Sequence, residues 1–367
     1  MYANVRRVYK NSLGKESFIL SDLLYDYNQV TLKRNFSCGG DQGTWHDTPF
    51  YECNSLPSPI PSDLIEMIAN PPTRNMSVAQ AIPALFDTIT ESIAHSWNPS
   101  AFHVIFHSSG YDSRIISAAI NRLSKNGKEW LGNTLFLSNR WEAKEFTEIM
   151  QTQGFSEFLA YTNGNAEDHF RSSLNIETAW RELNPPCPIP GNLWTYLIRY
   201  AQEQGHIPQN TLLQGYCGYW ANETWNSFTR PVNDWIGNVN NWYTFNTMAM
   251  LPFAVDSMEY PLIDLNVIDI LMKTNNAGGD ALRQEVATFS SPKTMSIQKQ
   301  SLSDCKHRIS EKLRNDVLSV YNKTWYAKNV CGMSVPTTSD FSNEWSKFSL
   351  ASLCEHLLQR SIKIEVK

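Results

Sequence analysis

The sequence has few charged residues and no excess of basic ones. Only 18% of its 367 residues are Asp, Glu, Lys or Arg, and the formal net charge is −5. Nucleic acids and anionic membranes attract proteins through a basic field, so this balance argues against both as general partners. No apolar run approaches the length of a membrane span, and the first residues lack the apolar core of a signal peptide. We therefore expect a cytoplasmic protein without membrane-spanning segments.

Closely paired cysteines are also missing. The seven cysteines are odd in number, widely spread and never in Cys-x-x-Cys spacing, which argues against a zinc knuckle or a redox pair. Aromatic residues, by contrast, make up 12% of the chain, which is typical of a globular protein with a large core. Turn signals and prolines predict a loop-rich segment over residues 1–76, ending near Pro71-Pro72, and a main domain over residues 77–367.

The most informative segment reads Phe-His-Val-Ile-Phe-His-Ser-Ser-Gly-Tyr-Asp-Ser-Arg over residues 102–114. The apolar run from Phe102 to Phe106 predicts a buried strand, and helical periodicity resumes after Gly110. Such a turn directs backbone N–H groups and the positive end of a helix at one spot, which is a geometry that binds phosphate. Asp112 would repel phosphates unless a cation lay between them. The segment therefore favours Mg²⁺-pyrophosphate as its ligand.

Further strand and helix patterns alternate along the chain. Residues 134–137 and 211–214 predict strands, the second of them stopped by Gly215, and helices are expected over 143–150 and 193–201. Another helix begins after Ser77, and Pro83 within its pattern predicts that the regular part starts near that proline. The C-terminal part is expected to be helical over 266–273, 281–288, 304–322 and 344–361.

This alternation predicts an α/β fold, with a parallel sheet that carries helices on both faces. Ligands of such sheets lie beyond the carboxyl ends of the strands. Three loops follow the predicted strands, at residues 108–113, 138–142 and 215–223. The sequence thus predicts one ligand site built from these three loops.

Several motifs resemble one enzyme family. Ser108-Ser109-Gly110-Tyr111-Asp112-Ser113 resembles the Ser-Gly-Gly-x-Asp-Ser loop of the ATP pyrophosphatases. Later segments resemble, in order, motifs of the synthetase domain of asparagine synthetase and of β-lactam synthetase. These are residues 212–218 for Leu-Ser-Gly-x-Gly-Ala-Asp-Glu, 261–264 for Pro-Phe-Leu-Asp, 281–283 for the Leu-Arg helix and 297–300 for an Arg-x-Lys segment. The resemblance spans residues 77 to 305 and implies the PP-loop fold of the adenine nucleotide alpha hydrolases.

The resemblance implies an ATP-dependent ligase that forms AMP. ATP would adenylate a carboxylate or carbonyl oxygen of a small molecule or peptide, pyrophosphate would leave, and ammonia or an amine would then attack. The resemblance implies Mg²⁺ on Asp112 and a pyrophosphate-neutralising role for Lys299. The residues that it implies for nucleotide binding are Ser108, Ser109, Gly110, Tyr111, Asp112, Ser113, Ser138 and Gly215.

Departures from the family pattern limit what the resemblance implies. Ser109 replaces a glycine and would be strained if its φ were positive. The family's second metal-binding Asp falls on Tyr219 and the neighbouring Glu on Trp220, so Glu223 is the nearest candidate for a replacement ligand or a general base. Tyr2 stands where the family's glutaminase has its catalytic cysteine. We therefore expect no hydrolysis of glutamine.

Plainer interpretations of the same residues remain open. Asp112 could cap a helix, and Lys299 could be a solvated loop lysine. The segment ending at Glu142 would border adenine and ribose, or Glu142 could be an acid in a first helical turn. His107 and Arg114 could be a core histidine and half of a salt bridge. A second hypothesis for the whole chain is a degenerate family member that binds a nucleotide or a partner without catalysis.

Overall fold

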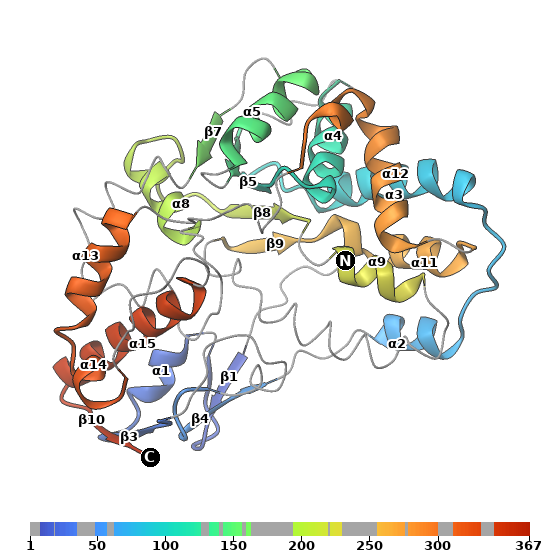
Figure 1. Cartoon of the computed structure of the whole chain (residues 1–367). Helices are drawn as coiled ribbons and strands as arrows, with labels where there is room; N and C mark the ends of the chain where they lie inside the picture. The colour runs from blue at the N-terminus through green and yellow to red at the C-terminus, as the bar shows by residue number, and fades with distance from the viewer. Residues whose placement is uncertain are drawn as a thin grey trace.

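A parallel sheet forms the centre of the molecule (Figure 1). The computed structural model describes residues 8–17, 19–34, 48–56, 62–125, 132–138, 142–155, 159–162, 194–218, 221–229, 255–275, 278–299, 311–331 and 341–367. The five strands of this sheet are β5 (Phe102–His107), β6 (Thr134–Ser138), β7 (Leu159–Thr162), β8 (Leu213–Cys217) and β9 (Ser257–Glu259). Their order is β7-β6-β5-β8-β9, and every neighbouring pair is parallel. The predicted α/β class with a parallel sheet is confirmed.

The order of the strands reverses at β5. The chain passes from β5 to β6 and β7 on one side, and returns to β8 and β9 on the other. In sheets of this kind the connections on the two sides leave in opposite directions, which opens a crevice at the carboxyl ends of the two central strands. The segment after His107 therefore lies at the position where doubly wound sheets bind their ligands.

Helices cover the sheet, and its central strands are buried along their whole length. Every residue of β5, β6 and β8 is buried, as expected for strands packed on both faces. The helices associated with the sheet are α3 (Val78–Ser96), α4 (Tyr111–Lys125), α5 (Ala143–Thr152), α8 (Trp194–Glu203), α9 (Ala221–Phe228), α11 (Leu265–Lys273) and α12 (Gly279–Ser290). Two 3₁₀ turns, η4 (Pro261–Ile263) and η5 (Pro292–Ser296), precede α11 and follow α12.

Two element boundaries differ from the sequence prediction. Helix α3 begins at Val78, well before Pro83, because Ser77 and Gln80 form a reciprocal capping box. The prediction that β8 ends at Gly215 is also wrong. Gly215 lies inside the strand, and a Cβ atom there would come within 2.7 Å of the Met258 side chain. The glycine therefore permits close packing between neighbours and ends no strand.

The C-terminal helices join the N-terminal segment in a second unit (Figure 1). They are α13 (Glu311–Tyr321), α14 (Trp325–Asn329) and α15 (Phe341–Gln359), while residues 304–310 of the predicted helix over 304–322 lie outside the described residues. The last strand, β10 (Lys363–Val366), pairs in parallel with β3 (Gln29–Leu32). Tyr25 also bonds His356 of α15, with 2.7 Å between Oη and Nε2. The two ends of the chain thus fold together.

The N-terminal segment is more regular than the prediction of a loop-rich stretch. Its remaining elements are β1 (Val8–Asn11), β2 (Glu16–Ser17), α1 (Leu20–Leu24), β4 (Cys53–Leu56) and α2 (Ser62–Ala69). Strands β2, β1 and β4 form a small antiparallel sheet in that order. The segment therefore has a structure of its own.

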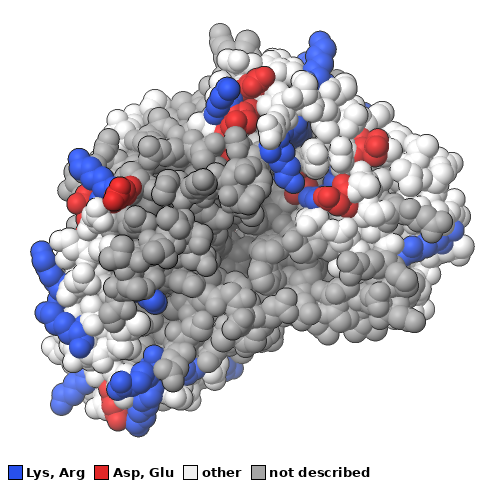
Figure 2. Space-filling view, viewed as in Figure 1, with Lys and Arg blue, Asp and Glu red and all other residues white. Residues whose placement is uncertain are grey.

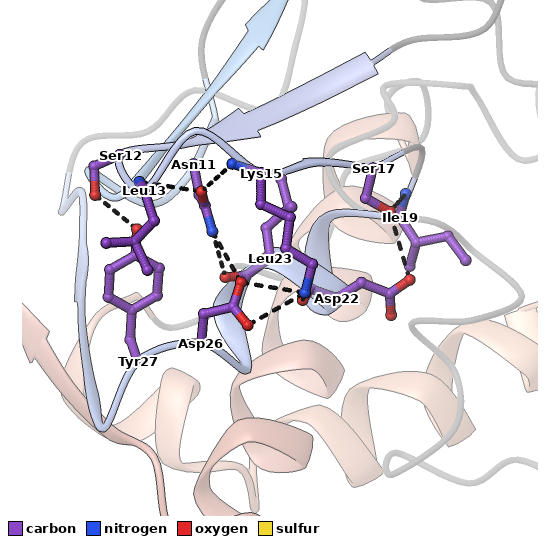
Figure 3. A network of polar contacts seen from close by, with 10 residues as sticks. All are labelled: Asn11, Ser12, Leu13, Lys15, Ser17, Ile19, Asp22, Leu23, Asp26 and Tyr27. Carbon is purple, nitrogen blue, oxygen red and sulfur yellow. Dashed lines mark hydrogen bonds and ion pairs between the residues drawn. The ribbon is translucent and has the colours of Figure 1, made fainter.

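Buried Asn11 holds the β1–β2 turn against α1 (Figure 3). Its amide nitrogen donates to the Asp26 carboxylate over 3.0 Å and to the Leu23 carbonyl over 3.4 Å. Its amide oxygen accepts from the backbone N–H groups of Leu13 and Lys15. All the hydrogen-bonding capacity of the amide is used, which explains how a polar side chain can be buried here.

Buried histidines in β5 predict a loss of stability in acid. Burial lowers the pKa of His103 to about 4 and that of His107 to about 3 from the usual 6.5. The unfolded chain therefore binds more protons, and the free energy of unfolding should fall as the pH drops from 6.5 towards 4, by about 1.4 kcal/mol per pH unit for each histidine. Urea denaturation across this range measures the loss.

The variant His103→Phe isolates one of these histidines, because a phenyl ring can keep the stacking on Trp97 (3.6 Å between ring centroids) without titrating. We expect a shallower dependence on pH than in the wild type, whereas the exposed control His95→Gln should match the wild type. Equal slopes for His103→Phe and the wild type would contradict the assignment.

Candidate active site

The loop between β5 and α4 is held in shape by its own side chains. Ser113 Oγ accepts the backbone N–H of Ser108 over 2.8 Å and lies 3.0 Å from Ser108 Oγ. Ser108 Oγ also accepts the backbone N–H of Gly110 over 3.1 Å. The two serine hydroxyls therefore organise the turn, and the first-turn N–H groups of α4, which have no acceptor within their helix, remain at its end.

Ser109 is accommodated without backbone strain. Ser109 is not among the described residues with positive φ, so the glycine of the family pattern is not required here. Its side chain is fully buried. Its backbone N–H and its hydroxyl both donate to Glu142 Oε1, over 3.0 and 2.9 Å. A buried carboxylate thus accepts the loop N–H group at the point where a phosphate oxygen would be expected.

Glu142 immediately precedes α5, but its side chain makes no capping hydrogen bond to that helix. It bonds the loop of the neighbouring strand instead. This role differs from both interpretations of the sequence, a border of the adenine site and an acid of the first helical turn. No sequence motif predicts this contact of Glu142, because the contact depends on β5 and β6 lying side by side.

Asp112 is paired with a buried arginine. Both of its carboxylate oxygens accept from Nη1 of Arg283 in α12, over 2.7 and 2.8 Å. Nη2 of the same guanidinium donates to Asn222 over 2.7 Å and to Asp280 over 2.5 Å. The side chain of Arg283 is 5% exposed and that of Asp112 is 22% exposed. This charge network links α4, α9 and α12.

The ends of β5 and β8 approach each other closely at Asp112. A Cβ atom on Gly218, the residue after β8, would lie 2.6 Å from Cβ of Asp112. Only glycine fits at this distance. The switch point of the sheet therefore brings together the two glycine-containing segments that the sequence marks, and places the carboxylate of Asp112 beside them.

Arg114 ties a distant segment to the same loop. It is buried, and burial lowers its pKa. It donates to three backbone carbonyls, those of Ser109 (3.0 Å), Thr294 (2.6 Å) and Ile297 (2.9 Å). The salt bridge considered from the sequence is thus replaced by carbonyl acceptors. These bonds hold η5 and the residues after it against the start of α4.

Because Arg114 holds the segment after η5 in place, Lys299 lies beside the Ser108–Ser113 loop. Its Nζ atom is 5.1 Å from the centre of the Tyr111 ring, although the two residues are far apart in sequence. The lysine is exposed, so its charge faces solvent at the beginning of α4. The structure thus brings together Lys299 and the Ser108–Ser113 loop, which the sequence had connected only through a resemblance.

His107 belongs to the core. It is buried, its Nε2 atom is 3.1 Å from Ser117 Oγ, and burial together with the charge of Arg114 lowers its pKa to about 3. It is therefore neutral at physiological pH. Its neighbour across the sheet is Ser138, which ends β6. Ser138 is fully buried, and its hydroxyl finds no hydrogen-bond partner in the described part of the chain.

The remaining predicted site residues are dispersed. Gly215 lies within β8, in contact distance of Phe106 and Met258, and not in a loop beyond the strand. Glu223 lies in the first turn of α9, and its side chain is outside the described residues, as are Tyr219 and Trp220. Asp264, which was not predicted as a site residue but ends the motif at 261–264, caps α11 by accepting the N–H of Asn266.

The described residues do not fit a divalent metal site. They contain no group of three or more His, Cys, Asp or Glu side chains that could hold a metal ion. The carboxylate that the sequence assigned to Mg²⁺, that of Asp112, is engaged on both oxygens by Arg283. A hard cation such as Mg²⁺ requires oxygen ligands that are available to it. The Mg²⁺ ion expected on Asp112 therefore has no set of ligands among the described residues.

Figure 2 shows both basic and acidic side chains on the upper part of the viewed face, in the region between α5 and α12 of Figure 1. None of the helices in the described part of the chain combines the length and apolar character needed to cross a membrane.

Comparison with known protein families finds no match, and comparison with curated proteins finds no similar sequence.

Removing Glu142 should expose an anion site. Glu142→Ala deletes the acceptor of two hydrogen bonds of Ser109 and should lower the free energy of unfolding by about 1–3 kcal/mol. Pyrophosphate can then accept from this N–H group, so it should stabilise Glu142→Ala more than the wild type. Urea denaturation with and without pyrophosphate measures both effects.

Glu148→Ala is the matched control, because Glu148 is an exposed residue of the same helix. This variant should behave like the wild type in both measurements. Equal stabilisation of Glu142→Ala and the wild type by pyrophosphate would show that Glu142 does not occupy an anion site.

Proposed function

We propose that this chain is an ATP-dependent, AMP-forming ligase that binds the phosphates of ATP at the Ser108–Ser113 loop. The finer fold assignment, a PP-loop domain of the adenine nucleotide alpha hydrolase type, is part of the proposal. The substrates would be a small-molecule or peptide carboxylate and ammonia or an amine. The motif order described above supports the choice of ATP and of this reaction.

One observation carries the proposal. The loop follows the central strand β5 at the point where the strand order reverses, and exposed Lys299 lies against Tyr111 of the same loop. A helix N-terminus of this kind favours an anion through its N–H groups and its dipole, and α4 is long enough to have a full dipole. The lysine adds a positive charge at the same place.

The chemistry follows from this distribution of charge. A carboxylate oxygen of the substrate attacks the α-phosphorus of ATP, and the bond from that phosphorus to the bridging oxygen of the β-phosphate breaks. Negative charge grows on the departing pyrophosphate, and in this proposal Lys299 and the first turn of α4 stabilise it. The amine then attacks the carbonyl carbon of the acyl-adenylate, and AMP leaves with the electron pair of the broken C–O bond.

A second candidate function is nucleotide or partner binding without catalysis. It is favoured by the engagement of Asp112 with Arg283 and of the Ser109 N–H with Glu142. Both contacts occupy groups that the ligase family would use on its substrate. Under this alternative, isothermal titration detects ATP binding but no product forms.

Product analysis tests the ligase directly. Labelled ATP incubated with the protein, Mg²⁺, ammonium and a mixture of carboxylic acids should yield AMP and pyrophosphate in equal amounts. Formation of ADP would rule out the mechanism, because it requires cleavage at a different phosphorus. ATP binding with no turnover in any mixture would support the second candidate.

Lysine variants test the role of the positive charge. Lys299→Met should lower the rate of pyrophosphate release by about 10²- to 10³-fold, a loss typical of removing one group that stabilises transition-state charge. Lys293→Met is the matched control, because Lys293 is exposed in η5 of the same segment. Equal rates for both variants would remove Lys299 from the site.

A further inference from the structure

The contact between Asp112 and Arg283 changes what the loop requires of a cation. A carboxylate at the start of α4 would repel phosphates, and this repulsion is the reason why the sequence pointed to Mg²⁺. In the structure the guanidinium already neutralises this carboxylate through two hydrogen bonds to Nη1. The charge problem is therefore solved by a side chain of the protein.

Arg283 is fixed in this position by its surroundings. Its Nη2 atom bonds Asn222 of α9 and Asp280 of its own helix. Helix α12 packs closely on α9, because Gly279 at its start lies directly against the backbone of Trp225, where a Cβ atom would come within 2.4 Å. The positive charge is thus held by both its hydrogen bonds and the packing of the two helices.

A metal ion on Asp112 would have to bind beside this positive charge, which repels it, or displace the guanidinium. Displacement would leave Arg283 largely buried with one fewer carboxylate partner, and separating a buried ion pair is strongly unfavourable. Its buried Nε atom has no hydrogen-bond partner among the described residues, so displacement would add to the donors of this guanidinium that lack an acceptor. The arrangement therefore resists exchange of Arg283 for a divalent ion.

We propose that Arg283 replaces the divalent metal of the phosphate loop, so that phosphate binding at Ser108–Ser113 requires no metal ion on Asp112. Arg283 acts as a positioning residue that neutralises Asp112 and joins α4 to α12. The ligand class is free nucleotide or inorganic pyrophosphate in place of their Mg²⁺ complexes. The ligand part of this inference rests on the proposed function, whereas the absence of a metal on Asp112 does not.

Manganese binding tests the inference without any nucleotide. Mn²⁺, a paramagnetic substitute for Mg²⁺, is titrated into the wild type and Asp112→Asn, and free Mn²⁺ is measured by electron paramagnetic resonance. The two titrations should coincide, because Asp112 holds no metal. A Mn²⁺ site that is present in the wild type and lost in Asp112→Asn would overturn the proposal.

Nucleotide titrations test the same point from the ligand side. ATP should bind the wild type in EDTA with an affinity within about tenfold of that in excess Mg²⁺. Arg283→Gln frees the Asp112 carboxylate and should make binding depend on Mg²⁺. The charge-conserving control Arg283→Lys should remain less dependent on Mg²⁺ than Arg283→Gln. Binding by the wild type that is abolished in EDTA and restored by Mg²⁺ would overturn the proposal.

The outcomes separate this inference from the proposed function. If no nucleotide or pyrophosphate binds under any condition, the proposed function fails, and the Mn²⁺ titration still decides whether Asp112 holds a metal. If Arg283→Gln does not fold, the comparison of Asp112→Asn with the wild type is sufficient, since that substitution removes the charge and keeps the side-chain shape.

Discussion

The architecture of the candidate site depends on the solvation of one buried cation. The Arg114 guanidinium lies in the interior, where an unpaired charge would be very costly, and it is satisfied by carbonyl oxygens from two separate parts of the chain. This requirement draws the segment after α12 onto the start of α4. The hydrogen bonds from Arg114 to this segment therefore explain why Lys299 lies beside Tyr111.

The sheet supplies the second constraint, which is one of position. Because β5 is central and the order reverses there, the segments after β5 and β8 meet at one place. These two segments contact each other where Gly218 lies against Asp112. Three charged side chains then contact the loop. Glu142 accepts from Ser109, Arg283 donates to Asp112, and Lys299 lies over the ring of Tyr111. Charge of both signs is thus distributed around the first turn of α4.

Much of this fold could be predicted from the sequence, because local patterns dictate it. The apolar run of β5 and the helical spacing after Gly110 are such local signals, and both elements form where they were predicted. Strands β7 and β9 were not predicted. The three residues of β9 are too few to give a periodic signal, and they form a strand only because β8 offers them a pairing edge.

The site was less predictable, for a physical reason. The sequence marked the loop and Lys299 as candidates, but it did not predict that Glu142 and Arg283 contact the loop. Such ion pairs and buried hydrogen bonds depend on distances between elements that are remote in the chain. Arg283 was visible within a motif, yet nothing in the motif indicates that its guanidinium faces Asp112. Gly215 was misread because a glycine needed for close packing looks the same in sequence as one that ends a strand.

The pairing of β3 with β10 bears on how the polypeptide is made. During translation the edge of β3 emerges early, whereas its partner follows only after the parallel sheet and its helices have been synthesised. A contact of such large sequence separation is slow to form and leaves an open strand edge on the nascent chain for most of its synthesis.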